Sequence, residues 1–172
     1  ASAYHHIHLP SNEHEIDVEI HFRPSSGVWN QFSNKRIQKS LNEEIAKENK
    51  LVEEGFRVPS MRFALIMQLA HIQKHFMDLG VGLRQIVDYY FLLKADNGLG
   101  FRVESLGRGE DDGLELRDES LECSLKHLGL WKFAGAVMWV LHEVLGLDEA
   151  YMIAPMDEWR GRMLLDAILR GD

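Results

Sequence analysis

The strongest constraint on the fold is the alternation of apolar and ionisable residues from Glu13 to Arg23, EHEIDVEIHFR. Every second position is apolar: Ile16, Val18, Ile20 and Phe22. Because successive side chains of a β-strand point to opposite faces, this period of two predicts a strand with one face on a core. The other face carries Asp17, Glu19, His21 and Arg23, and this face is our candidate for the functional site.

Two carboxylates and a histidine follow one another on that second face, about 6 to 7 Å apart along the strand. Asp17 and Glu19 can hold a divalent cation between them, since hard ions such as Mg²⁺ prefer carboxylate oxygens. A solvated face of an edge strand is the alternative interpretation. A slip of one residue in register would reverse both faces, so the pattern leaves Asp17 and Glu19 both open as the main ligand.

The composition narrows the class of protein. A chain of 172 residues has the length of one domain, and its net charge of −8 provides no basic surface for a nucleic acid partner. The single cysteine, Cys123, excludes an internal disulfide and fits a reducing compartment, so we expect a cytoplasmic protein. No apolar run approaches the ~20 residues that span a bilayer, and no membrane partner is expected.

The first residues predict a β-hairpin. Residues 3–9 alternate weakly, and Pro10 begins a turn before the strand described above. A two-stranded hairpin is marginal alone, so it must lie on helices or complete a sheet. The polar stretch 34–49 follows, and its thin apolar stripe predicts a solvent-facing helix: Ile37, Leu41 and Ile45.

Helical patterns dominate from residue 59 onward. Ser60 is a candidate cap for a helix that is apolar nearly all round between residues 63 and 70 and is broken by Gly80 and Gly82. The next helix has apolar residues at helical spacing: Leu83, Ile86, Val87, Tyr90 and Phe91. We expect these two helices to form the centre of the core.

The remaining chain predicts three more helices after a Gly- and Asp-rich excursion at 96–118. One helix covers residues 119–128, the next covers 131–145, and Gly129 and Gly146 end them. The last helix follows Pro155, and its expected inward face comprises Trp159, Met163, Leu164, Ala167 and Ile168. The predicted fold class is therefore α+β, mostly α, with an N-terminal hairpin (residues 1–58, with the polar helix) and a helical bundle (59–172).

Histidines offer a second kind of metal site. His5, His6, His8 and His14 can form a transition-metal cluster with His21, although histidines without fixed spacing are common near turns. His71 and His75 share one helical face, but residue 72 is Ile, so the glutamate of the HExxH zinc pattern is absent. Capping or hydrogen bonding within the core is the better interpretation of that pair.

Arg84 and Asp88 are four residues apart on a predicted helix, with the cation nearer the N-terminus. This order is the weaker one for a pair within a helix, so each side chain is expected to meet another partner. Arg84 also follows a Gly-Val-Gly turn at a helix N-terminus, where backbone N–H groups favour an anion. A phosphate contact and a structural salt bridge are both open.

Three segments carry a resemblance to a known family: VEIHFRP at 18–24, HIQKHFMDLGVGLRQIVDYYFLL at 71–93 and LKHLGLWKFAGAVMWVL at 125–141. The chain resembles the bacterial family of uncharacterised nucleotidyltransferases with the polymerase-β-type fold. The resemblance implies that the hairpin is part of a nucleotidyltransferase sheet. It also implies an acidic pair on one strand and a further carboxylate on a later strand.

The resemblance implies Mg²⁺-dependent transfer of a nucleotidyl group from a nucleoside triphosphate to an acceptor that the sequence does not identify. Glu19 corresponds to the later carboxylate, Asp17 is the second candidate for metal binding and catalysis, and His21 is expected to contact the carboxylate or a phosphate. Lys74 and Arg84 are candidates for binding the triphosphate or the acceptor. The resemblance also implies a glycine-containing motif before the acidic pair. No Gly-Ser or Gly-Gly step precedes Asp17, so we expect a fragment that lacks this first catalytic motif and is inactive alone.

The rival hypothesis is a non-catalytic helical interaction module. Its hairpin would pair with the sheet of a partner, and a homodimer through the hairpin is one form of this pairing. Nucleotidyl transfer requires further acidic residues close to Glu19, whereas an interaction module does not. A histidine-based metal hydrolase ranks last, because it needs the N-terminal histidines to converge with His71 and His75.

Overall fold

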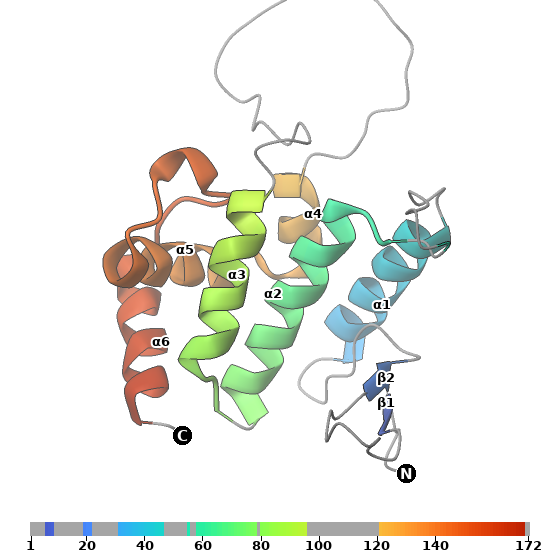
Figure 1. The fold of residues 1–172 in the computed structure, drawn as a ribbon, viewed down its shortest axis with the longest axis horizontal. Coiled ribbons are helices and arrows are strands. Elements are labelled where there is room, and N and C mark those ends of the chain that lie inside the picture. The colour runs from blue at the N-terminus through green and yellow to red at the C-terminus, as the bar shows by residue number, and fades with distance from the viewer. Residues whose placement is uncertain are drawn as a thin grey trace, which may run out of the picture. The chain divides into compact units, whose positions relative to one another are not determined.

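The structure is a computed structural model, and it describes residues 6–8, 19–21, 31–46, 55, 58–78, 80–95 and 121–170. The chain divides into two compact units, Ala1–His71 and Ile72–Asp172. The described elements have the following bounds, and Figure 1 labels the strands and α-helices among them. They are β1 (His6–His8), β2 (Glu19–His21), α1 (Gln31–Ala46), α2 (Met61–Asp78), α3 (Leu83–Ala95), α4 (Leu121–Leu128), α5 (Trp131–Leu145), the 3-10 turn η2 (Glu149–Tyr151) and α6 (Glu158–Arg170).

The predicted fold class is wrong. The described residues are almost entirely helical, and the expected α+β fold, with a hairpin as part of a larger sheet, is not seen among them. β1 and β2 have three residues each and pair antiparallel only with each other within the described part. Alternation in the sequence favours an extended chain, but a sheet layer needs further strands to pair with, and three residue pairs do not supply one.

The helices follow the sequence closely. Ser60 caps α2 as predicted, since its Oγ accepts a hydrogen bond of 3.1 Å from the backbone N–H of Phe63. Gly146 ends α5 with φ 66° and ψ 36°, a left-handed conformation that costs glycine nothing. Its N–H donates to the carbonyl of His142 and the next N–H, of Leu147, donates to Leu141, which satisfies two carbonyls of the last turn. The predicted excursion at 96–118 lies outside the described residues.

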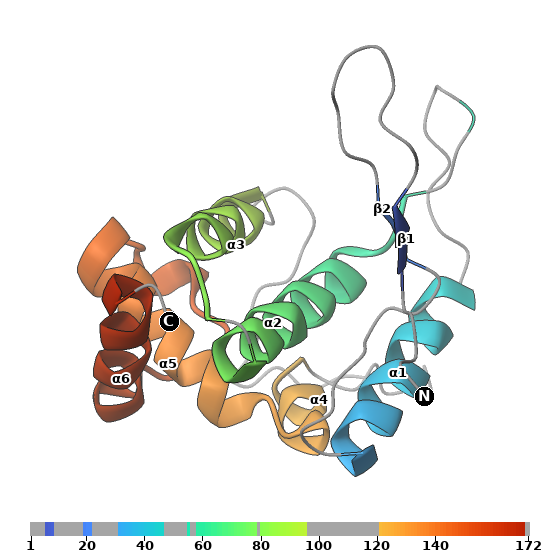
Figure 2. The same cartoon turned by 90° about the horizontal axis from the view of Figure 1, so that it is seen from below.

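The second unit is built around α5. Eight consecutive or near-consecutive residues of this helix are buried: Phe133, Ala134, Gly135, Ala136, Val137, Met138, Val140 and Leu141. α5 packs against α3, α4 and α6, and both views show it among them (Figures 1 and 2). Phe76 of α2 meets Phe133 with ring centroids 5.9 Å apart. A helix that is apolar nearly all round is expected in such a central position.

Two glycines bring α5 and α6 close together. A Cβ on Gly135 would lie 2.7 Å from the carbonyl oxygen of Pro155, in the segment that leads into α6. A Cβ on Gly161 would lie 2.7 Å from Cδ2 of the Trp139 ring. Both distances are below any normal carbon contact, so side chains larger than hydrogen do not fit there without a shift of their neighbours.

The structure corrects part of the predicted core. α3 buries Ile86, Tyr89 and Leu93, whereas Leu83 is 45% exposed and Phe91 is 64% exposed. On α6, Leu164 is buried as expected. Two other residues of its expected inward face are exposed, Trp159 at 66% and Met163 at 51%. Both helices carry apolar residues on two faces, and a count of apolar spacing alone does not say which face turns inward.

No single helix among the described residues is long and apolar enough to cross a membrane. α4 and α5 meet the criteria of length and composition only as a pair, which is bent by 116°. The division of the chain after residue 58 that the sequence suggested stays a prediction.

Candidate functional site

The strand pair contains part of the predicted acidic site. In its register the Cα atom of Glu19 pairs with that of His8, and the Cα atom of His21 pairs with that of His6. The antiparallel ladder therefore brings two of the predicted site residues next to two of the N-terminal histidines along the backbone. Asp17, His5 and His14 lie outside the described residues.

The two predicted cations lie on helices of the second unit. Lys74 is half-buried on α2 and interacts with a neighbour, and Arg84 is exposed as the second residue of α3. Glu19 and His21 belong to the first unit. The cations and the acidic strand therefore belong to different units, and their assignment to one site stays a prediction.

His71 and His75 are half-buried on α2, and each interacts with a neighbour. Among the residues that the structure describes, no group of three or more His, Cys, Asp or Glu side chains is arranged to hold a metal ion.

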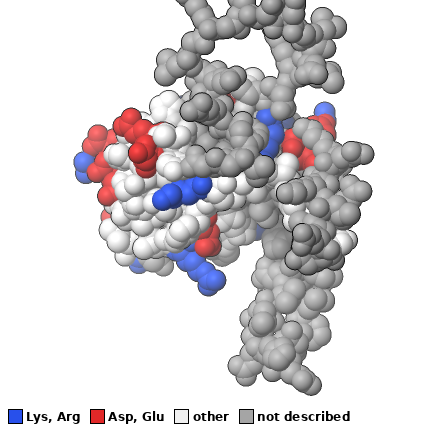
Figure 3. Space-filling view, turned by 45° about the horizontal axis from the view of Figure 1, so that its top comes forward, with Lys and Arg blue, Asp and Glu red and all other residues white. Residues whose placement is uncertain are grey.

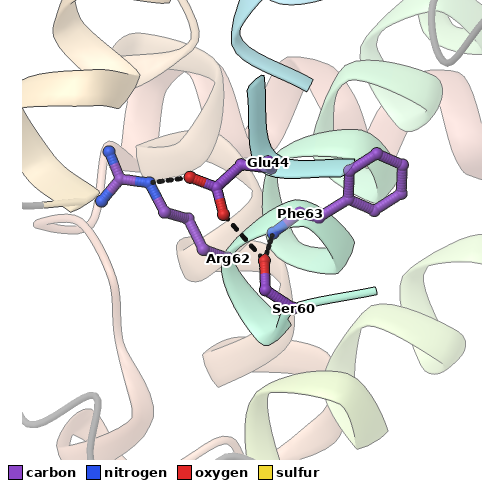
Figure 4. A network of polar contacts seen from close by, with 4 residues as sticks. All are labelled: Glu44, Ser60, Arg62 and Phe63. Atoms are coloured by element: carbon purple, nitrogen blue, oxygen red, sulfur yellow. Dashed lines mark hydrogen bonds and ion pairs between the residues drawn. The ribbon is translucent and has the colours of Figure 1, made fainter. Parts of the chain in front are cut away.

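The first unit contains a buried polar network that the sequence did not indicate. Glu44 of α1 is 6% exposed and Arg62 of α2 is 8% exposed. Their closest charged atoms, Glu44 Oε1 and Arg62 Nε, are 3.6 Å apart. The second oxygen of Glu44, Oε2, accepts a hydrogen bond of 2.9 Å from the hydroxyl of Ser60, the residue that caps α2 (Figure 4). One carboxylate thus contacts both the cap and the first turn of α2.

The face that α1 turns inward explains why this network was missed. The predicted stripe was Ile37, Leu41 and Ile45, and the first two are buried as expected. Ile45 is 49% exposed, and Glu44 takes the inward place one position earlier. Both i+7 and i+8 continue a helical stripe that starts at Ile37, and hydrophobicity alone selects the isoleucine. The signal that could have revealed the network was Glu44 at i+7 from Ile37, together with Arg62 near the start of the next helix.

The turn between α2 and α3 is held by two hydrogen bonds between Gly82 and Gln85. Gly80 has φ 85°, a left-handed conformation that favours glycine. The N–H of Gly82 donates to Oε1 of Gln85 at 2.8 Å, and the N–H of Gln85 donates back to the carbonyl of Gly82 at 3.2 Å. This reciprocal pair resembles a capping box and orders the start of α3.

Arg84 and Asp88 do not pair with each other across the first turn of α3. Both are exposed, and neither side chain forms an ion pair or hydrogen bond with any residue that the structure describes. The lack of a pair agrees with the weaker attraction expected when the cation lies nearer the N-terminus of the helix. The prediction that each side chain meets some other partner stays open.

A half-buried carboxylate with a lowered pKa lies at the start of α6. Asp157 Oδ1 accepts a hydrogen bond of 3.0 Å from the backbone N–H of Arg160, and Oδ2 accepts one of 2.6 Å from its guanidinium. The backbone hydrogen bond, followed by the side-chain hydrogen bond, lowers the pKa of Asp157 below its usual value. This pattern is that of a helix cap, in which each oxygen of the carboxylate accepts a hydrogen bond from Arg160.

Charges on the described surface are mixed. Figure 3 shows several acidic side chains at the left of the described surface and others elsewhere on this face, with single cations between uncharged areas.

A comparison with protein families gives one match. Residues 1–105 match the family of uncharacterised nucleotidyltransferases. The matched stretch includes the segments 18–24 and 71–93 that carried the resemblance, while the segment 125–141 lies beyond it. No curated protein and no solved structure matches the chain. The match covers more than half of the 172 residues, and the chain therefore belongs to the uncharacterised nucleotidyltransferase family.

Proposed function

We propose that the protein takes part in Mg²⁺-dependent transfer of a nucleotidyl group from a nucleoside triphosphate to an acceptor hydroxyl. The observation that carries this proposal is the family match over residues 1–105, which includes the acidic strand and the α2–α3 region. The alternation at Asp17 and Glu19 supports it, because these are the hard oxygen donors that suit Mg²⁺.

The reaction joins the acceptor oxygen to the α-phosphorus and breaks the bond from that phosphorus to the pyrophosphate oxygen. The acceptor loses its proton, and pyrophosphate leaves. Bound Mg²⁺ would supply stabilisation of the charge that develops on the phosphate oxygens. In our proposal Glu19 is the main carboxylate, which binds the cation or takes the proton of the acceptor hydroxyl, and Asp17 is the second ligand.

The remaining candidate residues have supporting roles in the proposal. His21 would orient the Glu19 carboxylate or donate a hydrogen bond to a phosphate oxygen, since His21 and Glu19 lie on the same short strand β2. Lys74 and Arg84 would contact the triphosphate, because guanidinium and ammonium groups neutralise phosphate charge. Of these two, Arg84 is the more accessible to a ligand, as it is exposed on α3 while Lys74 is half-buried.

Titration calorimetry with ATP, in the presence and absence of Mg²⁺, tests the proposal. We expect binding that requires Mg²⁺ and that weakens at least about tenfold in Glu19→Ala. The matched control is Glu122→Ala, which removes an exposed carboxylate of α4 that pairs with Lys126 at 2.6 Å. The control should bind ATP as the unchanged chain does.

Two results would contradict the assignment. Equal losses in Glu19→Ala and Glu122→Ala would show a general effect of charge, and binding without Mg²⁺ would exclude the carboxylate-metal arrangement. Absence of ATP binding by the unchanged chain, with circular dichroism that shows the expected helices, would favour the rival hypothesis of an interaction module.

A further inference from the structure

The pairing of β1 with β2 sorts the residues of the two strands by face. The register joins His6 with His21, Ile7 with Ile20 and His8 with Glu19. Residues directly opposite in an antiparallel pair share a face, and so do residues two apart on one strand. Both isoleucines therefore lie on one face of the strand pair. Glu19 shares the other face with all three histidines of the two strands.

The backbone positions rank these histidines by their separation from Glu19. His8 is directly opposite Glu19 in the ladder, and the Cβ atoms of such partners are about 4.5–5.5 Å apart. His21 lies two residues further along the same strand, a separation of about 6–7 Å. His6 is the diagonal neighbour, at about 7–8 Å. The register thus makes His8 the nearest of the three to Glu19.

We infer that His8 is a positioning residue for Glu19: its imidazole donates a hydrogen bond to one carboxylate oxygen and so directs the other oxygen toward the cation. This role rests on the proposed function, in which Glu19 binds Mg²⁺. Carboxylates that bind metal ions are themselves hydrogen-bonded, and these outer partners orient the ligand. The imidazole does not compete for the ion, because Mg²⁺ is bound by oxygen ligands.

The same ranking assigns His21 to a phosphate oxygen. The proposed function leaves His21 two roles, and the nearer His8 takes the orienting one. The residue opposite His21 in the ladder is His6, another imidazole. Two neighbouring imidazoles suit an anion, because each donates an N–H and a protonated one adds positive charge. The strand pair therefore has a carboxylate end, His8 with Glu19, and an imidazole end, His6 with His21.

Titration of the imidazoles by NMR, in the full chain without nucleotide, tests the pairing directly. A neighbouring carboxylate stabilises a protonated imidazole and raises its pKa. Glu19→Gln removes the charge and keeps the shape of the side chain, so we expect the pKa of His8 to fall by more than that of His21 or His6. Single changes of each histidine to alanine assign the signals. A larger fall at His21 than at His8, or no fall at any of the three, overturns the inference.

Titration calorimetry with Mg²⁺ and ATP tests whether His8 acts through Glu19. His8→Ala should weaken Mg²⁺-dependent binding about tenfold, as the loss of an outer partner of a metal ligand does. His8→Gln should recover most of this loss, because an amide also donates to a carboxylate. In a chain that already carries Glu19→Ala, His8→Ala should have no further effect.

The matched control is His6→Ala, which removes an imidazole from the same strand and the same face. Because His6 is paired with His21, any loss of affinity should be the same whether Glu19 is present or changed to alanine. Circular dichroism should show that all variants keep the helices of the unchanged chain.

The two experiments separate this inference from the proposed function. If the chain binds no ATP while Glu19→Gln lowers the pKa of His8, the pairing stands and the proposed function fails. If ATP binding requires Mg²⁺ and Glu19 but the losses from His8→Ala and Glu19→Ala simply add, the proposed function stands and the role of His8 is overturned.

Discussion

Two contacts in this chain are formed in opposite ways. At the start of α2 a buried carboxylate, Glu44, contacts Arg62 and the capping hydroxyl of Ser60. Between α5 and α6 the close approach depends on two glycines, and aromatic and backbone atoms fill the space above them. The first contact depends on the pairing of polar groups, and the second depends on the absence of side-chain volume.

The difference predicts how each contact fails. Removing one partner of a buried ion pair leaves the other charge without compensation in a medium of low polarity. Adding a methyl group to a tight apolar contact costs only what its neighbours need to move. Ion pairs on the exposed helix faces should matter least, because water solvates their charges in both the folded and the unfolded chain.

The largest effect is expected from Glu44→Ala. It should lower the free energy of unfolding by about 3–5 kcal/mol, because it removes the buried carboxylate beside Arg62 Nε and the acceptor of the Ser60 hydroxyl. Urea denaturation followed by circular dichroism measures this. The double variant Glu44→Leu with Arg62→Met removes both charges and should recover most of the loss. A double variant as unstable as the single one would show that the loss does not come from the ion pair of Glu44 and Arg62.

Gly161→Ala tests the contact of α5 and α6. The new methyl group would meet the Trp139 ring, and we expect a loss of about 1–3 kcal/mol, even though alanine favours a helix more than glycine does. Thermal unfolding measures the loss. The control is Gly82→Ala, where the nearest atom would be 3.8 Å away and little should change. Equal stability of Gly161→Ala and the unchanged chain would show that the ring moves freely.

Asp157→Ala removes the cap of α6, and a loss of roughly 0.5–2 kcal/mol is expected. Because the folded pKa of Asp157 is lowered, the carboxylate contributes its full stability above the unfolded pKa of about 3.9. That contribution is lost as the pH falls through the folded pKa. The difference in stability between the unchanged chain and Asp157→Asn should therefore shrink at acidic pH, and a constant difference would contradict this assignment.

The smallest effect is expected at Glu43, the neighbour of Glu44 in the sequence. Glu43 pairs with Lys39 at 3.8 Å, and both side chains are mostly exposed, at 63% and 79%. Glu43→Gln should change the free energy of unfolding by less than about 0.5 kcal/mol. The same denaturation experiment applies, and a loss comparable to that of Glu44→Ala would show that burial is not what separates the two residues.

These cases show what the sequence contained and what it did not. The helices could be predicted because caps and terminators such as Ser60 and Gly146 act locally. The inward face of a helix depends on its neighbours, so Phe91 and Trp159 were assigned to the core and are exposed. The predicted sheet was wrong for a related reason, since a strand needs partners that its own alternation does not supply.

The family was predictable from the sequence, whereas the candidate site itself stays a prediction. Glu19 and Asp17 were found from the alternation of residue types, which is a property of the sequence alone. Their distance from Lys74 and Arg84 depends on how distant segments fold together, and no periodicity encodes that. The network of Glu44 was missed for the same reason, because its partner Arg62 lies 18 positions further along the chain.

The contact of Phe76 with Phe133 links the two stretches that the family match separates. Phe76 lies inside residues 1–105 and Phe133 lies beyond them, yet their ring centroids are only 5.9 Å apart. A change in the size of one ring therefore alters the packing of the other. Among relatives that keep α5, a smaller residue at one of these positions should be accompanied by a larger residue at the other, so the two stretches are expected to co-evolve.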